Sequence, residues 1–218
     1  MLNQTIMSVG TYVQYGCGYS APSEWVNFDA SPTLRIQRLP LLGGLFRKRM
    51  KVSFPKNVRY GDIVKGLPLE DNSCDGLYCS HVLEHLSYED FIKAIQNSYR
   101  VLKPGGTFRL VMPDLENLVR SYLDNKTKGN PEASVAFMSN TGIAFRQRPR
   151  GLRGMVKSAF GNSHHLWLWD TDAAIHELRQ AGFKDIRKCG FNDSGDQMFQ
   201  LVEDADRFDN ALALEMKK

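Results

Sequence analysis

The stretch CDGLYCSHVLEHLSYEDFIKAIQNSYRVLKPGGTFRLVM, residues 74–112, decides the fold. Residues 75–80 and 107–112 are short runs rich in apolar side chains, and each predicts a strand. Between them, Ser87 and the acidic residue three positions later form an approximate capping box, which predicts the start of a helix. Lys103-Pro-Gly-Gly106 predicts the end of that helix and a turn. Because parallel strands require such a crossover, this order of elements predicts a parallel α/β sheet.

Other segments extend the predicted sheet. Strands are predicted at Thr11–Tyr15, Trp25–Asp29, Val58–Gly61, Phe183–Phe191 and Leu212–Met216. Helices are predicted at Leu115–Leu123 and at Thr171–Ala181. Only about ten residues separate the first two strands, fewer than a crossover usually takes. The helix between these strands is therefore expected to be vestigial or replaced by a loop.

The composition is that of an ordinary globular chain, with 218 residues, 42% hydrophobic and 24% charged. We expect one domain over residues 1–218, with insertions at 32–57 and 125–169. No stretch approaches the roughly 20 apolar residues that cross a bilayer, and the N-terminal residues do not form a secretory signal. The four cysteines form no C-x-x-C pair. These features predict a cytoplasmic protein without a structural metal.

Positive charge is concentrated in two windows without acidic residues, although the formal net charge is only +4. The window between Asp29 and Asp62 contains Arg35, Arg38, Arg47, Lys48, Arg49, Lys51, Lys56 and Arg59. The window between Glu132 and Asp170 contains Arg146, Arg148, Arg150, Arg153 and Lys157. Such local charge is evidence about partners rather than about fold. The windows are either solvated loops or sites for an anionic partner.

Ligands of an open parallel sheet bind at the carboxyl ends of its strands, so the residues that follow each strand are candidate site residues. They are Gly16-Cys17-Gly18, Asp29, Asp62, Ser80-His81 and Pro113-Asp114. The glycines allow close approach of a ligand to the backbone, although a plain tight turn also explains a G-x-G. A carboxylate that ends the second strand, as Asp29 does, can accept hydrogen bonds from both hydroxyls of a ribose. The sequence lacks the G-x-G-x-x-G of a dinucleotide site and the Gly-Lys-Ser/Thr of a P-loop.

Several segments resemble those of the class I S-adenosylmethionine-dependent methyltransferases. They are YVQYGCG (12–18), WVNFD (25–29), LPLEDNSCDGLYCSHVLEH (67–85), YRVLKPGG (99–106) and AGF (181–183). The resemblance covers residues 11–217 and implies a Rossmann-like fold: a mostly parallel seven-stranded sheet, helices on both faces and a C-terminal antiparallel strand. It also implies a methyltransferase that uses S-adenosylmethionine. The short link between the first two strands is similar to that of methyltransferases in surface-polysaccharide and lipid-linked sugar pathways.

The resemblance implies cofactor contacts from Gln14, Gly16, Cys17, Gly18, Asp29, Asp62, Ile63 and Ser80. By this resemblance the backbone of the two glycines runs alongside the methionine part of the cofactor. Asp29 holds the ribose, and Asp62 with Ile63 flanks the adenine. Two positions depart from the family pattern. Gln14 stands where an acidic residue usually lies near the cofactor's amino group, and Ser20 replaces the third glycine. Because the amide oxygen of Gln14 can still accept a hydrogen bond, we expect weakened rather than abolished binding.

Three residues are candidates for the chemistry of methyl transfer: His81, Asp114 and His164. By the resemblance, His81 faces the methyl-transfer cleft. Asp114 follows the fifth strand, where a carboxylate base would be placed. His164 lies in the segment 125–169, which is expected to cover the acceptor, and imidazole titrates near neutral pH.

The letters His81-Val-Leu-Glu84-His85 also spell H-x-x-E-H, the motif of the inverted zinc proteases. That site requires both histidines on one helical face. Here His81 directly follows a strand and the helix is predicted to begin near Ser87, so the two histidines need not share a face. We therefore expect no metal, and we expect Glu84 and His85 to stabilise the loop after the strand.

The predicted acceptor is a small molecule or a glycan, and the basic residues of the second window indicate that it carries phosphate or carboxylate. The apolar run at 39–46, followed by basic residues up to Lys51, is typical of contact with a membrane surface, here the inner face of the membrane. A buried loop beside a solvated charged run is the alternative.

Two other functions fit the sequence. A non-catalytic binding module with a methyltransferase fold is favoured by Gln14 and Ser20. A nucleic-acid methyltransferase is favoured by the localised basic residues. The acidic remainder of the chain and the lack of an aromatic-basic stacking pattern make nucleic acid the weaker choice.

Overall fold

The computed structural model describes residues 10–38, 53–147, 151 and 164–218. The described residues form a seven-stranded sheet in the order β3-β2-β1-β4-β5-β7-β6. Its strands are β1 Tyr12–Tyr15, β2 Trp25–Asp29, β3 Val58–Tyr60, β4 Cys74–Ser80, β5 Leu102–Pro113, β6 Lys184–Lys188 and β7 Ala211–Lys217. Only β7 runs antiparallel to its neighbours, β5 and β6. The predicted mostly parallel sheet with an antiparallel C-terminal strand is therefore confirmed.

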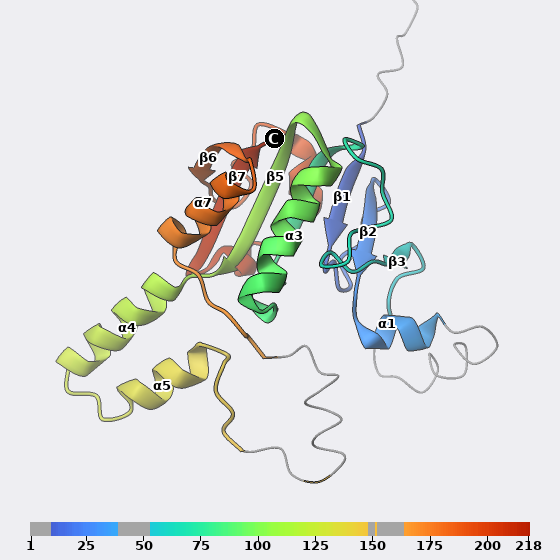
Figure 1. The fold of residues 1–218 in the computed structure, drawn as a ribbon. Helices are drawn as coiled ribbons and strands as arrows, with labels where there is room; N and C mark the ends of the chain where they lie inside the picture. Colours follow the sequence, from blue (N-terminus) through green and yellow to red (C-terminus); the bar gives the residue numbers. More distant parts are fainter. Residues whose placement is uncertain (1–9, 39–52, 148–150, 152–163) are drawn as a thin grey trace, which may run out of the picture.

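Helices lie on both faces of the sheet. The α-helices are α1 Pro32–Gln37, α3 Tyr88–Val101, α4 Leu115–Thr127, α5 Ala133–Asn140 and α7 Thr171–Gln180. Three short 3₁₀ helices are η1 Leu83–His85, η2 Gln197–Leu201 and η3 Ala205–Phe208. Figure 1 shows α3 and α7 lying side by side over one face. Side chains of η2 and η3 pack against the opposite face.

Local sequence explains where the two main helices begin. Ser87 caps α3, because its side chain accepts a hydrogen bond from the amide nitrogen of Asp90. Asp170 caps α7 in the same way, with Oδ1 2.8 Å from the amide nitrogen of Ala173. Residues 16–24, between β1 and β2, contain turns and no helix. The predicted helices and the predicted loop are thus confirmed.

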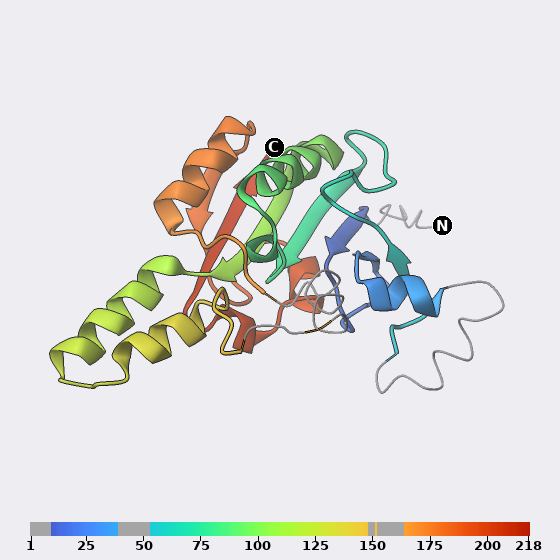
Figure 2. The same cartoon turned by 60° about the horizontal axis from the view of Figure 1, so that its bottom comes forward.

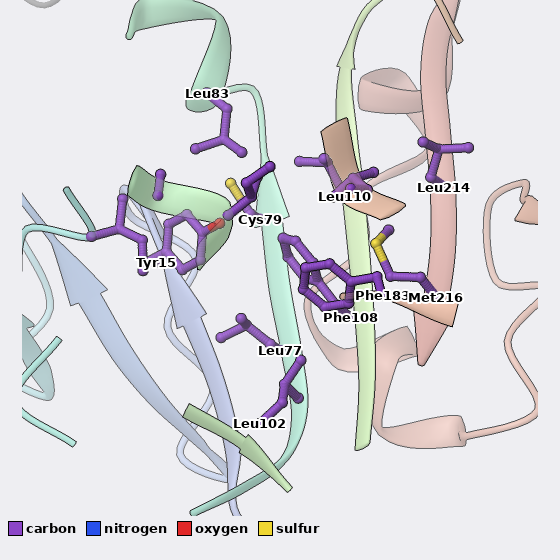
Figure 3. Packing of buried hydrophobic residues seen from close by; sticks show 14 of the residues in the cluster. Tyr15, Leu77, Cys79, Leu83, Leu102, Phe108, Leu110, Phe183, Leu214 and Met216 are labelled. Atoms are coloured by element: carbon purple, nitrogen blue, oxygen red, sulfur yellow. The ribbon is translucent and has the colours of Figure 1, made fainter. Parts of the chain in front are cut away.

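The main core lies between the sheet and the pair α3 and α7. Alternate residues of β1, β4 and β5 face this side, because side chains of a strand alternate between its faces. Figure 3 shows how these side chains meet those of β7. They include Tyr15, Leu77, Cys79, Phe108, Leu110, Leu214 and Met216, all buried. Complete burial of such a side chain stabilises the fold by about 1.5–3 kcal/mol.

The opposite face is covered by the segment that connects β6 to β7. Phe199 and Val202 of this segment pack with Trp25 and Tyr78 of the sheet. Arg109 of β5 also points to this side and is fully buried.

The predicted strand Phe183–Phe191 is too long, since β6 ends at Lys188. The chain leaves the sheet there because the carbonyl of Gly190 accepts a hydrogen bond from Arg109 and its amide donates to Asp193.

Helices α4 and α5 form a hairpin that projects from the sheet (Figures 1 and 2). The rings of Tyr122 and Phe137 join the two helices, with centroids 5.4 Å apart. No residue of α4 is buried, and α5 buries only Ala133. None of the helices in the described part of the chain is long and apolar enough to cross a membrane. The proposed membrane contact at 39–51 and most of the second basic window lie outside the described residues.

Candidate functional site

A cleft of about 790 Å³ lies at the carboxyl ends of the parallel strands; we call it the large cleft. It brings together residues from four strand ends. They are Gly16 after β1, Asp29 at the end of β2, Asp62 and Ile63 after β3, and His81 after β4. Ligands of open α/β sheets bind at this edge.

The turn after β1 requires glycine at two positions for different reasons. Gly16 has φ +66°, and a Cβ there would lie 2.1 Å from Cγ2 of Val82. Gly18 has φ +55°, but a Cβ there would meet no atom within 4 Å. Positive φ alone favours glycine at Gly18, whereas Gly16 also lacks room for any side chain.

Asp29 is oriented by backbone amides. Its Oδ2 accepts from the amide of Gly18 at 3.1 Å, and its Oδ1 accepts from the amide of Ser31 at 2.7 Å. A carboxylate has about four lone-pair sites, so two remain for a ligand. Asp29 is buried, with 8% of its surface exposed, and it lines the large cleft.

The residues after β3 form one wall of the large cleft. Oδ1 of Asp62 accepts from the amide of Val64 at 3.1 Å, and Oδ2 pairs with Nζ of Lys65 at 3.1 Å. Ile63 is buried and contributes apolar surface. This wall therefore places an apolar side chain beside a charged pair.

His81 is held in an unusual conformation, with φ +53°. Its Nε2 donates to the carbonyl of Arg207 at 2.8 Å, and its Nδ1 lies 3.4 Å from Oε1 of Glu84. Burial by itself lowers the pKa of His81, but Glu84 and the Arg207 carbonyl outweigh it and raise the pKa above its usual value. The ring is thus fixed from both sides at the wall of the large cleft.

A second cavity of about 480 Å³, the small cavity, is lined by Gln14, Cys17 and Ser80. The amide nitrogen of Gln14 donates to the carbonyl of Ser20 at 2.8 Å and to Oδ1 of Asn27 at 2.6 Å. These bonds leave its amide oxygen as the acceptor. Burial raises the pKa of the Cys17 thiol to about 12, so this thiol is protonated at neutral pH.

The eight predicted cofactor residues are therefore not all in one place. Gly16, Asp29, Asp62 and Ile63 line the large cleft, and Gln14, Cys17 and Ser80 line the small cavity, which Gly16 also borders. Gly18 lines neither and instead holds Asp29.

Sequence reasoning missed Glu203 and Arg207, which line the small cavity from the segment before β7. No motif marks them. Arg207 contacts the end of β4, donating from Nη1 to the carbonyl of Ser80 at 3.2 Å.

Two of the three predicted catalytic residues lie outside both cavities. Asp114 caps α4, with Oδ1 2.9 Å from the amide of Glu116, and lines a separate cavity of about 300 Å³. The ring of His164 stacks near Phe145, with centroids 3.9 Å apart, and its carbonyl accepts from Nδ1 of His85. Among these candidates, His81 alone lines the large cleft.

Residues 13–110 match the family model described as a methyltransferase domain. The match covers a little under half of the chain and shows a similarity of this segment to methyltransferase domains. The matched residues run from β1 into β5, so they include all the strand ends that form the large cleft. The match supports a methyltransferase activity of this segment.

Solved structures with a similar fold include proteins described as methyltransferases. One is a SAM-dependent methyltransferase from Archaeoglobus fulgidus, 16% identical, with TM-score 0.48 over 96% of this chain and 86% of its own. Another, from Thermotoga maritima, is described as a possible histamine N-methyltransferase; it is 18% identical, with TM-score 0.49 over 96% and 82% of the two chains. At these values the likeness carries no conclusion about activity or acceptor. No curated protein matches the sequence.

Proposed function

We propose that the protein binds S-adenosylmethionine in the large cleft and transfers its methyl group to a small or glycan-type acceptor that carries negative charge. The observation that carries this proposal is the meeting of Gly16, Asp29, Asp62, Ile63 and His81 at one edge of the sheet. These residues come from four separate strand ends, and each has a chemical use toward an adenosyl sulfonium.

The residues present fit this cofactor. The cleft of about 790 Å³ lies within the usual range of about 300–1,000 Å³ for ligand sites. Asp29 keeps two lone-pair sites for the hydroxyls of a ribose, and Gly16 presents backbone without a side chain. Ile63 offers an apolar surface to the adenine.

When bound, the cofactor supplies an electrophilic methyl group, so the protein needs no covalent intermediate of its own. The remaining task of the chain is to align the acceptor and exclude water. His81, fixed by Arg207 and Glu84, forms the wall of the cleft at the end of β4. We place the acceptor beside this wall and residues 164–169, where the chain returns to the sheet.

Two features support an anionic acceptor of the glycan class. Lys65 lies at the rim of the large cleft, and its side chain is 76% exposed. The basic window between Glu132 and Asp170 precedes the segment that returns to the sheet. The helix-free link between β1 and β2 resembles that of methyltransferases for surface-polysaccharide or lipid-linked sugar acceptors. The membrane contact expected from the sequence of residues 39–51 would suit an acceptor of the lipid-linked kind.

Calorimetric titration with S-adenosylmethionine tests the cofactor site. Asp29→Asn keeps the shape of the side chain but removes its charge, and we expect the dissociation constant to rise about 10-fold or more, since hydrogen bonds to a charged group contribute about 1.5–3 kcal/mol. Asp124→Asn, on the exposed surface of α4, is the matched control and should leave the affinity unchanged. An unchanged dissociation constant for folded Asp29→Asn would refute the ribose assignment.

The acceptor class is tested separately, by following S-adenosylhomocysteine release with wild-type enzyme. We expect sugar acceptors that carry a phosphate or carboxylate to be methylated, and their neutral counterparts to react poorly. Methylation restricted to neutral acceptors would contradict an anionic acceptor while leaving the cofactor site intact.

A further inference from the structure

Three side chains with metal-ligating groups meet beside the large cleft. They are Glu84 and His85 of η1 and His165 of the segment that returns to the sheet. One ligand atom from each lies within 4.8 Å of the others. We propose that this cluster binds a divalent ion of the zinc class. The inference is independent of the proposed acceptor and of the cofactor assignment.

The strongest evidence is the state of the Glu84 carboxylate. Glu84 is 1% exposed, and neither of its oxygens has a hydrogen-bond partner among the described residues. Its ion-pair partner is His81, whose Nδ1 lies 3.4 Å from Oε1. A buried carboxylate is costly unless it is paired or coordinates a metal. Beyond the ion pair with His81, a bound cation would give the carboxylate the coordination that the described residues do not provide as hydrogen bonds.

Both histidines are held in the tautomer that a metal ligand requires. Nδ1 of His85 bonds to the carbonyl of His164 at 3.0 Å, and Nδ1 of His165 bonds to the carbonyl of Thr141 at 2.8 Å. A carbonyl oxygen can only accept, so each Nδ1 carries the proton and each Nε2 keeps its lone pair. Histidines that bind metal commonly donate their other nitrogen to a backbone carbonyl in this way.

Backbone bonds hold the two segments of the cluster together. The carbonyl of Glu84 accepts from the amides of Leu166 at 2.7 Å and Trp167 at 3.2 Å. The amide of His165 donates to the carbonyl of Gly142, which has φ +68°. A Cβ at Gly142 would lie 2.5 Å from Nδ1 of His165, so the histidine ring packs directly on the glycine backbone. The ligand positions are therefore fixed by the fold before any ion binds.

The ligand set favours zinc. Two imidazoles and one carboxylate form the kind of three-ligand zinc site that leaves a fourth position for water. Glu84 and His85 of the H-x-x-E-H motif are ligands in this site, and His165 is the third. His81 is not a ligand, because its Nε2 is bonded to the carbonyl of Arg207. This departs from the expectation of no metal that the sequence gives.

Zinc titration of the full chain, after chelator treatment, tests the proposal in competition with a chromophoric chelator. We expect one equivalent of zinc to bind. Glu84→Gln and His165→Gln should each weaken binding about 100-fold, at least as much as the loss of a neighbouring outer-shell group. His176→Gln removes an exposed histidine of α7 and is the matched control, with unchanged affinity expected.

Cobalt(II) provides a readout in the wild-type chain that does not depend on how the variants fold. A cobalt ion held by these ligands should give visible d–d absorption that stoichiometric zinc abolishes. If the wild-type chain binds no stoichiometric zinc and gives no such absorption, the proposal is overturned and His81 alone balances Glu84. Folded variants that bind zinc as the wild type does would also overturn it.

Discussion

The amide nitrogen of Gly18 donates a hydrogen bond to Oδ2 of Asp29 at 3.1 Å. This bond joins the turn after β1 to the end of β2, across a link that contains no helix. The amide of Ser31 holds the other oxygen of the same carboxylate. The loop that replaces the helix therefore fixes the side chain to which we assign the ribose, and such preorganisation is what a binding site requires.

Gly16→Ala is expected to destabilise the fold more than Gly18→Ala. Both substitutions place a side chain at positive φ, which costs about 1–2 kcal/mol. Only the alanine at 16 also collides with Val82, which adds about 1–3 kcal/mol of overpacking. Urea unfolding measures the difference, and Val82→Ala should restore part of the loss in the Gly16→Ala background. Equal free energies of unfolding for the two variants would contradict the close packing of Gly16 on Val82.

Gln14→Glu should lower stability, although it introduces the acidic residue that is usual in the class I methyltransferases that the sequence resembles. The amide nitrogen of Gln14 donates to two oxygens, and a carboxylate at this buried position would face both without a proton. We expect a loss of about 2–4 kcal/mol, since unpaired buried polar groups cost about 1–3 kcal/mol and charged ones more. Unfolding at pH 8 is the measurement. A variant as stable as wild type, with tighter cofactor binding, would contradict this prediction and show that position 14 accepts an acidic residue.

Arg109→Met should lower the free energy of unfolding, because Arg109 holds the segment that covers the second face of the sheet. Arg109 and Glu203 are both fully buried, with Nε 2.5 Å from Oε1, and Arg109 also binds Glu215 at 2.7 Å. Removing one partner leaves the other charge buried, at a cost of about 3–5 kcal/mol. The double variant Arg109→Met with Glu203→Gln should be more stable than the single one. If the double variant is less stable, the pair does not act as a unit.

Stability should fall in acid because of Asp193. Burial opposes its ionisation, but Arg187, the amide of Gly190 and Arg109 lower its pKa to about 2, from an ordinary value of 3.8. A lowered folded-state pKa contributes stability that is present above about pH 4 and lost as pH falls toward 2. Burial raises the pKa of Glu203 above its ordinary value of 4.5. This shift lowers stability above that pH, so its effect on the pH dependence is opposite to that of Asp193.

The carboxylate of Asp193 is 40% exposed, so solvent screening keeps its effect modest. Asp193→Asn should therefore flatten the acid limb of a plot of unfolding free energy against pH. An unchanged slope between pH 4 and 2 would exclude this carboxylate as its source.

Much of the site is predictable because it depends on strand ends. Parallel strands bring their carboxyl ends to one edge, so Gly16, Asp29, Asp62 and His81 were expected together and are found together. The long helices were predictable for a similar reason, since caps such as Ser87 and Asp170 are local signals.

The rest depends on contacts between residues far apart in the sequence. Strand β5 begins at Leu102 rather than Thr107, because Leu102 pairs with Cys74 of β4. The segment between β6 and β7 has no periodic pattern and is held by Arg109, more than 80 positions away from Asp193. Gln14 points to the small cavity because its neighbour Tyr15 faces the main core, and strand side chains alternate.

A crystal structure with S-adenosylhomocysteine tests the central claim most directly, because the large cleft and the small cavity both border the turn after β1. We predict the nucleoside in the large cleft, with its ribose hydroxyls on the carboxylate of Asp29 and its adenine against Ile63. A nucleoside in the small cavity, beside Gln14 and Ser80 and without contact to Asp29, would contradict the account.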